Sequence, residues 1–331
     1  MNVETSARGS LQLGQTGPRV FPIALGCMGM SGMYGSSDER ESVATIHAAL
    51  ERGVNLIDTG DFYGMGHNEL LVGRALQGKR DQAVLSVKFG ALRSPGGGWG
   101  GFDGRPAALR NFLAYSLTRL GVDYVDIYRP ARLDPAVPIE DTIGAIAELV
   151  KAGYVRAIGL SEVGPDTIRR AHAVHPIADL QIEYSLVSRG AETKIFPVLS
   201  ELGIAVTAYG VLSRGLLSGS LPSQAEDYRA HLPRFTGDDG EHNRKLVAAL
   251  GELARSRGIS TSQLAIAWAL SKGEAIVPVL GARKRTQLAE ALDALSVRLR
   301  PEDIRAMEAL GASARGDRYQ AAQMAHLDSE K

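Results

Sequence analysis

Short apolar runs recur along the chain and alternate with longer amphipathic segments. Each run is rich in Val, Ile, Ala or Tyr and nearly continuously apolar, which is typical of strands buried on both faces of a parallel sheet. We expect eight such strands: FPIALGC from Phe21, VNLIDT from Val54, AVLSVKF from Ala83, YVDIY from Tyr124, VRAIGLS from Val155, ADLQIE from Ala178, IAVTAYG from Ile204 and AIVPVL from Ala275.

The segments between these runs predict helices. DERESVATIHAALERG from Asp38 and GRPAALRNFLAYSLTRLG from Gly104 space their apolar residues by three and four and end on Gly. No linker rich in Pro, Ser or charge divides the chain, so one closed (β/α)8 TIM barrel of the α/β class is favoured over an open doubly wound sheet of two domains. We expect a single domain over residues 1–331, with its core at about 20–310.

Several segments add to this barrel. Glycines and a Gly-Pro pair in residues 11–20 predict an N-terminal β-hairpin. Residues 90–104 follow the third strand and residues 213–240 follow the seventh, so both long loops are expected on the carboxyl face, where barrels place their chemistry. The C-terminal tail, residues 311–331, has weak periodicity and is expected either to pack over the barrel or to stay mobile.

Composition narrows the function classes. Lys and Arg together number 37, as do Asp and Glu, so no positive field favours nucleic acid or an acidic membrane surface. No uncharged apolar stretch of about 18 residues predicts a membrane span. The single cysteine, Cys27, excludes an intrachain disulfide and a multi-cysteine metal site. We expect a cytoplasmic protein without a metal, and its oligomeric state stays open.

One glycine motif needs weighing. Gly96, Gly98 and Gly101 formally match the G-x-G-x-x-G pattern of dinucleotide-binding folds. The match begins several residues after the strand, and Pro95 and Trp99 interrupt the tight strand-to-helix turn that the pattern requires. A loop that carries one aromatic residue is the better interpretation.

Polar residues near two strand ends are more informative. Asp58 ends the second predicted strand, Tyr63 follows five residues later, and Lys88 lies near the end of the third strand. Each alone is more often structural, because lysines snorkel and acids cap loops. In a barrel the three converge, and an ammonium beside a phenol favours the phenolate and brings proton transfer nearer to neutral pH. They form a candidate proton donor in which Asp58 orients Lys88.

A second cluster follows the last strand. Arg283, Lys284 and Arg285 lie at the start of a predicted helix, in the region where barrels bind phosphate. A solvated basic turn is the alternative. The small residues of SRGLLSG, which follows the seventh strand, favour the phosphate site because they allow the backbone close to an anion.

These residues stand in an ordered series that resembles the aldo-keto reductase superfamily over nearly the whole chain. The series runs through LGCMGMSGMYG, DTGDFYG, SVKFG, GYVRAIGLSE, QIEYSL, AYGVLSRGLLSG and VPVLGARKRTQLAEAL. The resemblance implies a barrel that binds extended NADP(H) on its carboxyl face and reduces aldehydes or ketones. Asp58, Tyr63 and Lys88 match three members of the catalytic tetrad of that family.

The fourth member of the tetrad is absent. The family has a histidine at the end of the fourth strand, and DIYRPARLD places Ala131 there. Alanine cannot donate to a developing oxyanion. Arg129 lies two residues earlier on the strand, so by alternation it points the same way, and we expect it to compensate in part. Trp99, Tyr63 and Arg129 are the expected substrate contacts.

The resemblance also implies the cofactor contacts. Ser161, Glu162 and Gln181 match the residues around the nicotinamide carboxamide, and Tyr209 matches the aromatic residue that stacks on the nicotinamide. The strand-one edge is Gly26, Cys27 and Met28; the pyrophosphate segment is Gly210, Leu212, Ser213, Arg214, Gly215 and Leu217; the site for the adenosine and its 2′-phosphate is Gly281, Arg283, Gln287 and Glu290.

Two functions follow from this pattern. The first is NADPH-dependent reduction of a small carbonyl compound, or the reverse oxidation of an alcohol, with Tyr63 as proton donor. The second is an NADP(H)-binding regulatory or redox-sensing subunit, in which Ala131 marks weakened catalysis. Three intact tetrad positions favour the enzyme.

Overall fold

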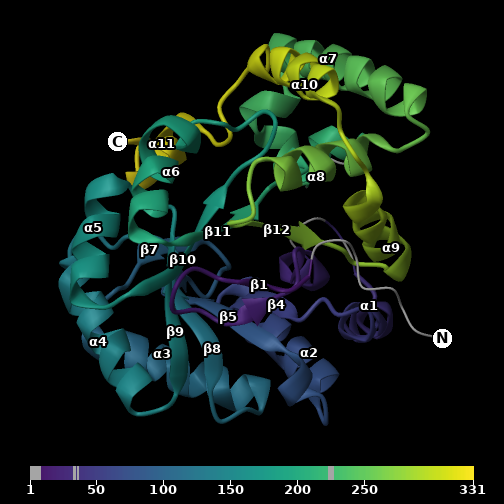
Figure 1. Ribbon diagram of the computed structural model, residues 1–331. Helices are drawn as coiled ribbons and strands as arrows, with labels where there is room; N and C mark the ends of the chain where they lie inside the picture. The colour runs from purple at the N-terminus through teal and green to yellow at the C-terminus, as the bar shows by residue number, and fades with distance from the viewer. Residues whose placement is uncertain (1–8, 33–34, 36, 223–226) are drawn as a thin grey trace.

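The computed structural model describes residues 9–32, 35, 37–222 and 227–331, and it shows a closed barrel of eight parallel strands (Figure 1). Around the barrel the strands follow the order β10-β11-β12-β3-β4-β5-β8-β9. Their bounds are β3 Ala24–Gly26, β4 Leu56–Gly60, β5 Val84–Phe89, β8 Val125–Pro130, β9 Val155–Ser161, β10 Ile177–Glu183, β11 Ala205–Tyr209 and β12 Ile276–Gly281. Each of the eight predicted apolar runs contributes one strand, so the predicted fold class is confirmed.

Helices surround the barrel and connect its strands (Figure 1). They are α1 Glu39–Glu51, α2 His67–Leu76, α3 Pro106–Leu120, α4 Ile139–Lys151, α5 Pro165–Val174, α6 Ala191–Leu202, α8 Thr261–Ser271 and α9 Arg285–Asp293. Local signals set their ends. The Asp38 side chain caps α1 by accepting from the Glu41 amide, and Gly121 ends α3 in the left-handed region at φ 64°.

The interior of the barrel has an apolar floor. Its side chains include Leu56, Ile127 and Val277, and they pack with Leu13 and Val20 from the N-terminal hairpin. That hairpin pairs β1 (Leu11–Gln12) with β2 (Arg19–Val20), as the sequence predicts. The amino end of the barrel is therefore closed by apolar packing, and polar groups are confined to the middle and the carboxyl end.

The two long loops and the tail acquire structure that the sequence does not predict. Residues 90–104 hold an antiparallel hairpin of β6 (Ala91–Arg93) and β7 (Trp99–Phe102). The loop after β11 holds the short 3₁₀ helices η4 (Ser213–Ser218), η5 (Tyr228–His231) and η6 (Pro233–Phe235), while its residues 223–226 lie outside the described residues.

Beyond the loop, α7 (Gly237–Ser256) lies beside α10 (Pro301–Ala312), at the top of Figure 1. The tail continues through α11 (Ala321–Met324) and η8 (Asp328–Glu330) and packs on the barrel: the Asp328 carboxylate accepts from the Gly164 amide at 2.8 Å. The described part of the chain contains no helix of the length and apolar character that crossing a membrane requires.

Candidate active site

Asp58, Tyr63 and Lys88 come together at the carboxyl ends of β4 and β5. Asp58 lies in β4, Lys88 in β5, and Tyr63 begins the 3₁₀ turn η2 (Tyr63–Gly66) after β4. The Lys88 ammonium donates to the Asp58 carboxylate and lies 5.2 Å from the centre of the Tyr63 ring. The three residues are 4%, 7% and 4% exposed in chain order, so their charges act in a site largely shielded from water.

Burial and charge oppose one another at this ion pair. Burial alone would raise the pKa of Asp58, but Lys88 and Arg129 more than offset it, so the pKa lies below the ordinary carboxyl value. For Lys88 burial wins: it lowers the pKa below the ordinary lysine value although Asp58 favours the charged form. The geometry places a lysine with a lowered pKa against a phenol, with a carboxylate as its counter-ion.

Two further side chains hold Asp58 in place. Ser86 in β5 and Gln181 in β10 each donate to Asp58 Oδ2 at 2.9 Å. Sequence reasoning assigned Gln181 to the nicotinamide carboxamide and missed Ser86. Alternation from Lys88 was the available signal for Ser86, because residues two apart on a strand share a face.

Arg129 lies deeper than the prediction expects. Its guanidinium is fully buried inside the barrel, where it pairs with Asp179 at 2.7 Å and donates to Thr207 at 3.2 Å and Ser86 at 3.1 Å. Arg129 and Ala131 share the inward face of the strand, but two residues of a strand span about 6.6 Å, so Arg129 lies deeper in the barrel. Arg129 lies below the Asp58–Lys88 pair, where its guanidinium is bound by protein groups and closed to solvent.

Arg132 is the arginine that lies beside Ala131. Its Nη1 folds back to the Ala131 carbonyl at 2.6 Å and also donates to the Ser161 hydroxyl at 3.3 Å, while its Nη2 lies 3.4 Å from the Tyr209 hydroxyl. Ala131 itself is 2% exposed. Sequence reasoning missed Arg132 because it follows the end of β8, where strand alternation no longer applies.

Three residues that the resemblance assigns to the nicotinamide lie near Arg132 and the tail. Ser161 and Tyr209 lie within 3.4 Å of the Arg132 guanidinium, and Glu162 is bound by Arg318. Arg318 of the tail donates to both carboxylate oxygens of Glu162, at 2.8 and 2.6 Å, and the Tyr209 hydroxyl donates to Glu162 at 2.7 Å. Burial would raise the pKa of Glu162, but Arg318 lowers it to about 2. The tail thus covers this side of the site.

The segment predicted to contact the pyrophosphate winds tightly after β11. Leu212 precedes η4, which contains the predicted Leu217, and Ser213, Arg214 and Gly215 have φ values of 46°, 55° and 96°. The first two are residues other than glycine in the left-handed region, a conformation that costs of order 1–3 kcal/mol per residue and clusters at functional sites. The Arg214 guanidinium pairs with Glu183 at 2.7 Å.

The edge of β3 leaves bare backbone. Gly26 is paired in register with Gly281 of β12, and a Cβ built on Gly281 meets no atom closer than the Gly26 carbonyl oxygen at 4.0 Å. Cys27 follows, with its thiol buried and its amide donating to the Asp58 carbonyl at 2.9 Å; Met28 then begins η1 (Met28–Ser31). Burial raises the pKa of the Cys27 thiol, which disfavours the reactive thiolate.

The basic turn after β12 is partly neutralised. Arg285 pairs with Glu41 of α1 at 3.0 Å, whereas Lys284 is exposed. The Gln287 side chain accepts from the Arg283 amide at 2.9 Å, and Glu290 accepts from Ser260 at 2.6 Å. Gln287 and Glu290 therefore hold protein groups in this structure.

The nucleotide that the resemblance implies fits this arrangement. Gly281 of β12 exposes backbone to a flat group, and the left-handed turn of η4 lies on the same carboxyl face as the basic turn. The acidic side chains there, Glu162 and Glu183, are matched by Arg318 and Arg214. A dianionic pyrophosphate would meet neutralised acids and cationic residues.

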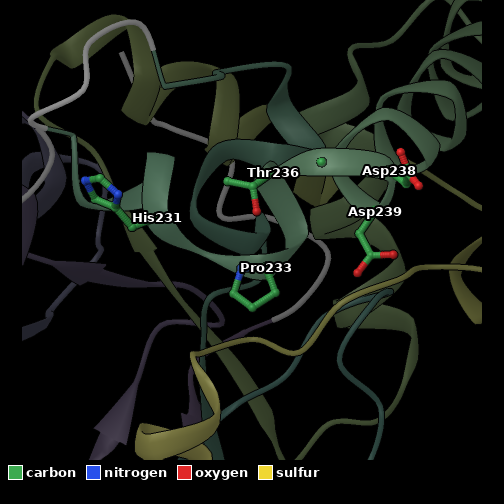
Figure 2. A pocket seen from close by; sticks show the side chains of 6 residues that line it. His231, Pro233, Thr236, Asp238 and Asp239 are labelled. Carbon is green, nitrogen blue, oxygen red and sulfur yellow. The ribbon is translucent and has the colours of Figure 1, made fainter.

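Trp99 borders the site through Phe62, and a hollow lies at the start of α7. Trp99 on β7 is 54% exposed and meets the Phe62 ring edge-on at 6.0 Å, and Phe62 in turn contacts Tyr63 at 4.8 Å. A hollow of about 420 Å³ at the start of α7 is lined by His231, Pro233, Thr236, Gly237, Asp238 and Asp239. In Figure 2 the imidazole of this hollow and its two carboxylates lie at opposite ends. It contains none of the predicted site residues.

Comparison with known proteins identifies the family. The aldo/keto reductase family model matches residues 22–312. A probable aldo-keto reductase from Glycine max is 39% identical over 302 residues, which cover 89% of this chain and 86% of the relative. The chain belongs to the aldo/keto reductase family.

Solved structures agree. A glycerol dehydrogenase from Gluconobacter oxydans superposes with a TM-score of 0.82 at 31% identity, covering 91% of this chain and 94% of its own. The holo form of an aldo-keto reductase from Bacillus halodurans superposes with a TM-score of 0.75 at 28% identity, covering 94% of this chain and 98% of its own. The fold and the oxidoreductase class are thus shared with these proteins.

Proposed function

We propose that the protein reduces an aldehyde or ketone with NADPH, and that it catalyses the reverse oxidation of an alcohol under suitable conditions. The observation that carries this proposal is the buried Lys88 ammonium, which is bound to the Asp58 carboxylate and lies 5.2 Å from the Tyr63 ring centre. The similarity to a glycerol dehydrogenase supports the reverse direction. The single cysteine and balanced charge support a single-domain cytoplasmic protein acting on a small molecule.

In this mechanism the chain supplies the proton and the electrostatic field. When bound, NADPH supplies the hydride that reaches the carbonyl carbon. The Tyr63 hydroxyl hydrogen-bonds to the substrate oxygen and transfers its proton as negative charge develops there. The Lys88 ammonium stabilises the phenolate that remains, and Asp58, held by Ser86 and Gln181, keeps that ammonium oriented. The low exposure of these groups strengthens each interaction.

We further propose NADP(H) as the preferred nucleotide over NAD(H). The 2′-phosphate is a dianion that cations must match, and Arg283 offers a planar bidentate fork beside the exposed Lys284. The nearest acid downstream, Glu290, lies well along α9 from this turn and accepts from Ser260 at 2.6 Å, so it is not placed to read an unphosphorylated ribose beside Arg283.

Steady-state NADPH oxidation with a panel of aldehydes and ketones tests the proposed activity, with Tyr63→Phe as the decisive variant. Loss of the general acid should lower turnover by about 10²- to 10⁴-fold while the NADPH dissociation constant stays nearly constant. Tyr115→Phe, which changes a tyrosine that is 57% exposed, is the matched control and should be silent.

The same experiment separates the two functions. A flat trace for every carbonyl compound, combined with retained nucleotide binding and a co-purifying protein, would favour the regulatory subunit that Ala131 suggests. Equal losses of NADPH binding and turnover in Tyr63→Phe would show that Tyr63 only shapes the pocket.

A further inference from the structure

The arginines near the carboxyl end of the barrel differ in whether a carboxylate lies at ion-pair distance. Arg214, Arg234 and Arg318 each lie 2.6–3.7 Å from a carboxylate oxygen, and Arg129 pairs with Asp179 deeper in the barrel. Arg132 has no carboxylate at ion-pair distance: among the described residues its guanidinium hydrogen-bonds to a backbone carbonyl and two hydroxyls, while the charge of Glu162 acts on it from further away. A cation whose hydrogen bonds all go to neutral groups can compensate a negative charge that arrives with a ligand.

The position of Arg132 connects this charge to the site. Nη1 lies 2.6 Å from the Ala131 carbonyl, so the guanidinium returns to the place where the family has its histidine. It contacts Ser161 and Tyr209. The pKa of Lys88 is lowered mainly by burial, and the positive charge of Arg132 adds to that lowering. Arg132 therefore lies beside Ser161 and Tyr209 of the predicted nicotinamide cradle, at the strand end that carries Ala131.

The guanidinium also has hydrogen-bonding capacity to spare. Its two Nη1 hydrogens serve the Ala131 carbonyl and the Ser161 hydroxyl, and one Nη2 hydrogen points to Tyr209 at 3.4 Å. The Nε hydrogen and the second Nη2 hydrogen make no hydrogen bond to any residue in the described ranges. A guanidinium has five donors and keeps its charge at every working pH.

We propose that Arg132 is a catalytic residue of this protein, which donates to the reacting carbonyl oxygen beside Tyr63 in place of the histidine that Ala131 lacks. The inference rests on the proposed function. It explains how a site without the fourth tetrad residue would stabilise the developing oxyanion. The attraction between a fixed cation and the substrate oxygen grows as that oxygen gains negative charge, and a shielded site strengthens it further. Unlike an imidazole, the guanidinium adds no titration of its own near neutral pH.

Kinetics of Arg132→Met form the first test. Loss of one oxyanion donor should lower kcat by about 10²- to 10³-fold, with KM and the NADPH dissociation constant changed only a few-fold. Added guanidinium at low millimolar concentration should restore part of the turnover of Arg132→Ala. Arg110→Met, which changes an arginine that is 45% exposed, is the control and should keep wild-type kinetics.

The double variant Ala131→His/Arg132→Met is the second test. It should recover at least ten-fold of the lost kcat, and its pH profile should gain a group that titrates near pH 6.5. A loss below three-fold in Arg132→Met, or a loss of NADPH affinity as large as the loss of kcat, would overturn the proposal. The second result would mean that Arg132 only positions the cradle through Ser161 and Tyr209.

Benzoate binding gives a readout that needs no turnover. Calorimetry with and without NADP⁺ should show that wild type binds benzoate, as an oxyanion probe, at least ten-fold more tightly than Arg132→Met does. Absence of benzoate binding, or equal binding by both proteins, contradicts the proposal. Failure of the proposed function is distinguishable, because it would appear as a flat trace with the wild-type protein or as full turnover in Tyr63→Phe. Failure of this inference alone leaves wild type active, Tyr63→Phe impaired and Arg132→Met active.

Discussion

Arg129 and Asp179 form an ion pair in which both side chains are 0% exposed. Replacing Arg129 by Met removes the 2.7 Å bridge and leaves the Asp179 carboxylate buried without its cation, with Thr207 as its remaining side-chain donor. Breaking a buried pair in this way costs about 3–5 kcal/mol, most of it from the uncompensated charge. We therefore expect Arg129→Met to lose about 3–5 kcal/mol of unfolding free energy at pH 7.

The pair itself contributes far less than this loss. Arg129 Nε and Asp179 Oδ1 are buried without a hydrogen bond in the described structure, so desolvation is incompletely offset. The double variant Arg129→Met/Asp179→Val should accordingly regain most of the stability and lie within about 2 kcal/mol of wild type. Gly159 should be kept, because a Cβ there would lie 2.8 Å from Asp179 Oδ1 and 3.0 Å from Arg129 Cζ.

Urea denaturation monitored by circular dichroism measures these differences, with the m-value checked for each variant. The matched control is Arg169→Met, which breaks a surface pair with Glu201 whose side chains are 44% and 58% exposed. That change should cost less than about 1 kcal/mol. The reasoning is refuted if Arg129→Met loses no more unfolding free energy than Arg169→Met does. It is also refuted if the double variant Arg129→Met/Asp179→Val is no more stable than Arg129→Met alone.

Two further predictions concern pH and the nucleotide. Burial and the nearby Glu69 raise the pKa of Asp61 from 3.8 to about 7, so the folded state keeps a proton that the unfolded state releases, and this residue makes stability fall as pH rises from about 4 to 7. In thermal unfolding, the unfolding free energy of Asp61→Asn should equal that of wild type at pH 4 and exceed it at pH 8 by up to about 4 kcal/mol. The control Asp81→Asn, which changes an exposed residue, should show no such pH-dependent difference. Equal dependence of the unfolding free energy on pH in Asp61→Asn and wild type would count against this account. Arg283→Ala should reduce the ratio of the NADH to the NADPH dissociation constant by roughly ten- to a hundred-fold. Arg285→Ala should reduce this ratio by less, because Arg285 is paired with Glu41. An unchanged ratio in Arg283→Ala would reject the phosphate site.

The barrel is predictable from sequence because its information is local. Each buried parallel strand is a short apolar run of branched residues, such as VRAIGLS, and each helix between strands carries its own spacing and end signals. The convergence of Asp58 and Lys88 follows from the same topology, since the carboxyl ends of neighbouring parallel strands meet at one edge of the barrel.

The tail and the long loops are not predictable in this way. Arg318 meets Glu162 across 156 residues of sequence, and neither residue has a neighbour whose pattern announces the pair. The hairpin of β6 and β7 rests on strands of three and four residues, too short to show a period. Contacts of this kind depend on tertiary placement, so the packing of the tail over Glu162 is visible only in the structure.

Arg129 and Arg132 show where a correct local rule stops being sufficient. Alternation rightly places Arg129 on the inward face with Ala131, but the interior of a closed barrel is stacked in layers, and two residues separate one layer from the next. At the lower layer Asp179, Thr207 and Ser86 hold the guanidinium. The strand β8 ends at Pro130, and Arg132, two residues later, folds back to the Ala131 carbonyl above the layer that Arg129 occupies. A charge assigned to a barrel site must therefore be placed by depth as well as by face.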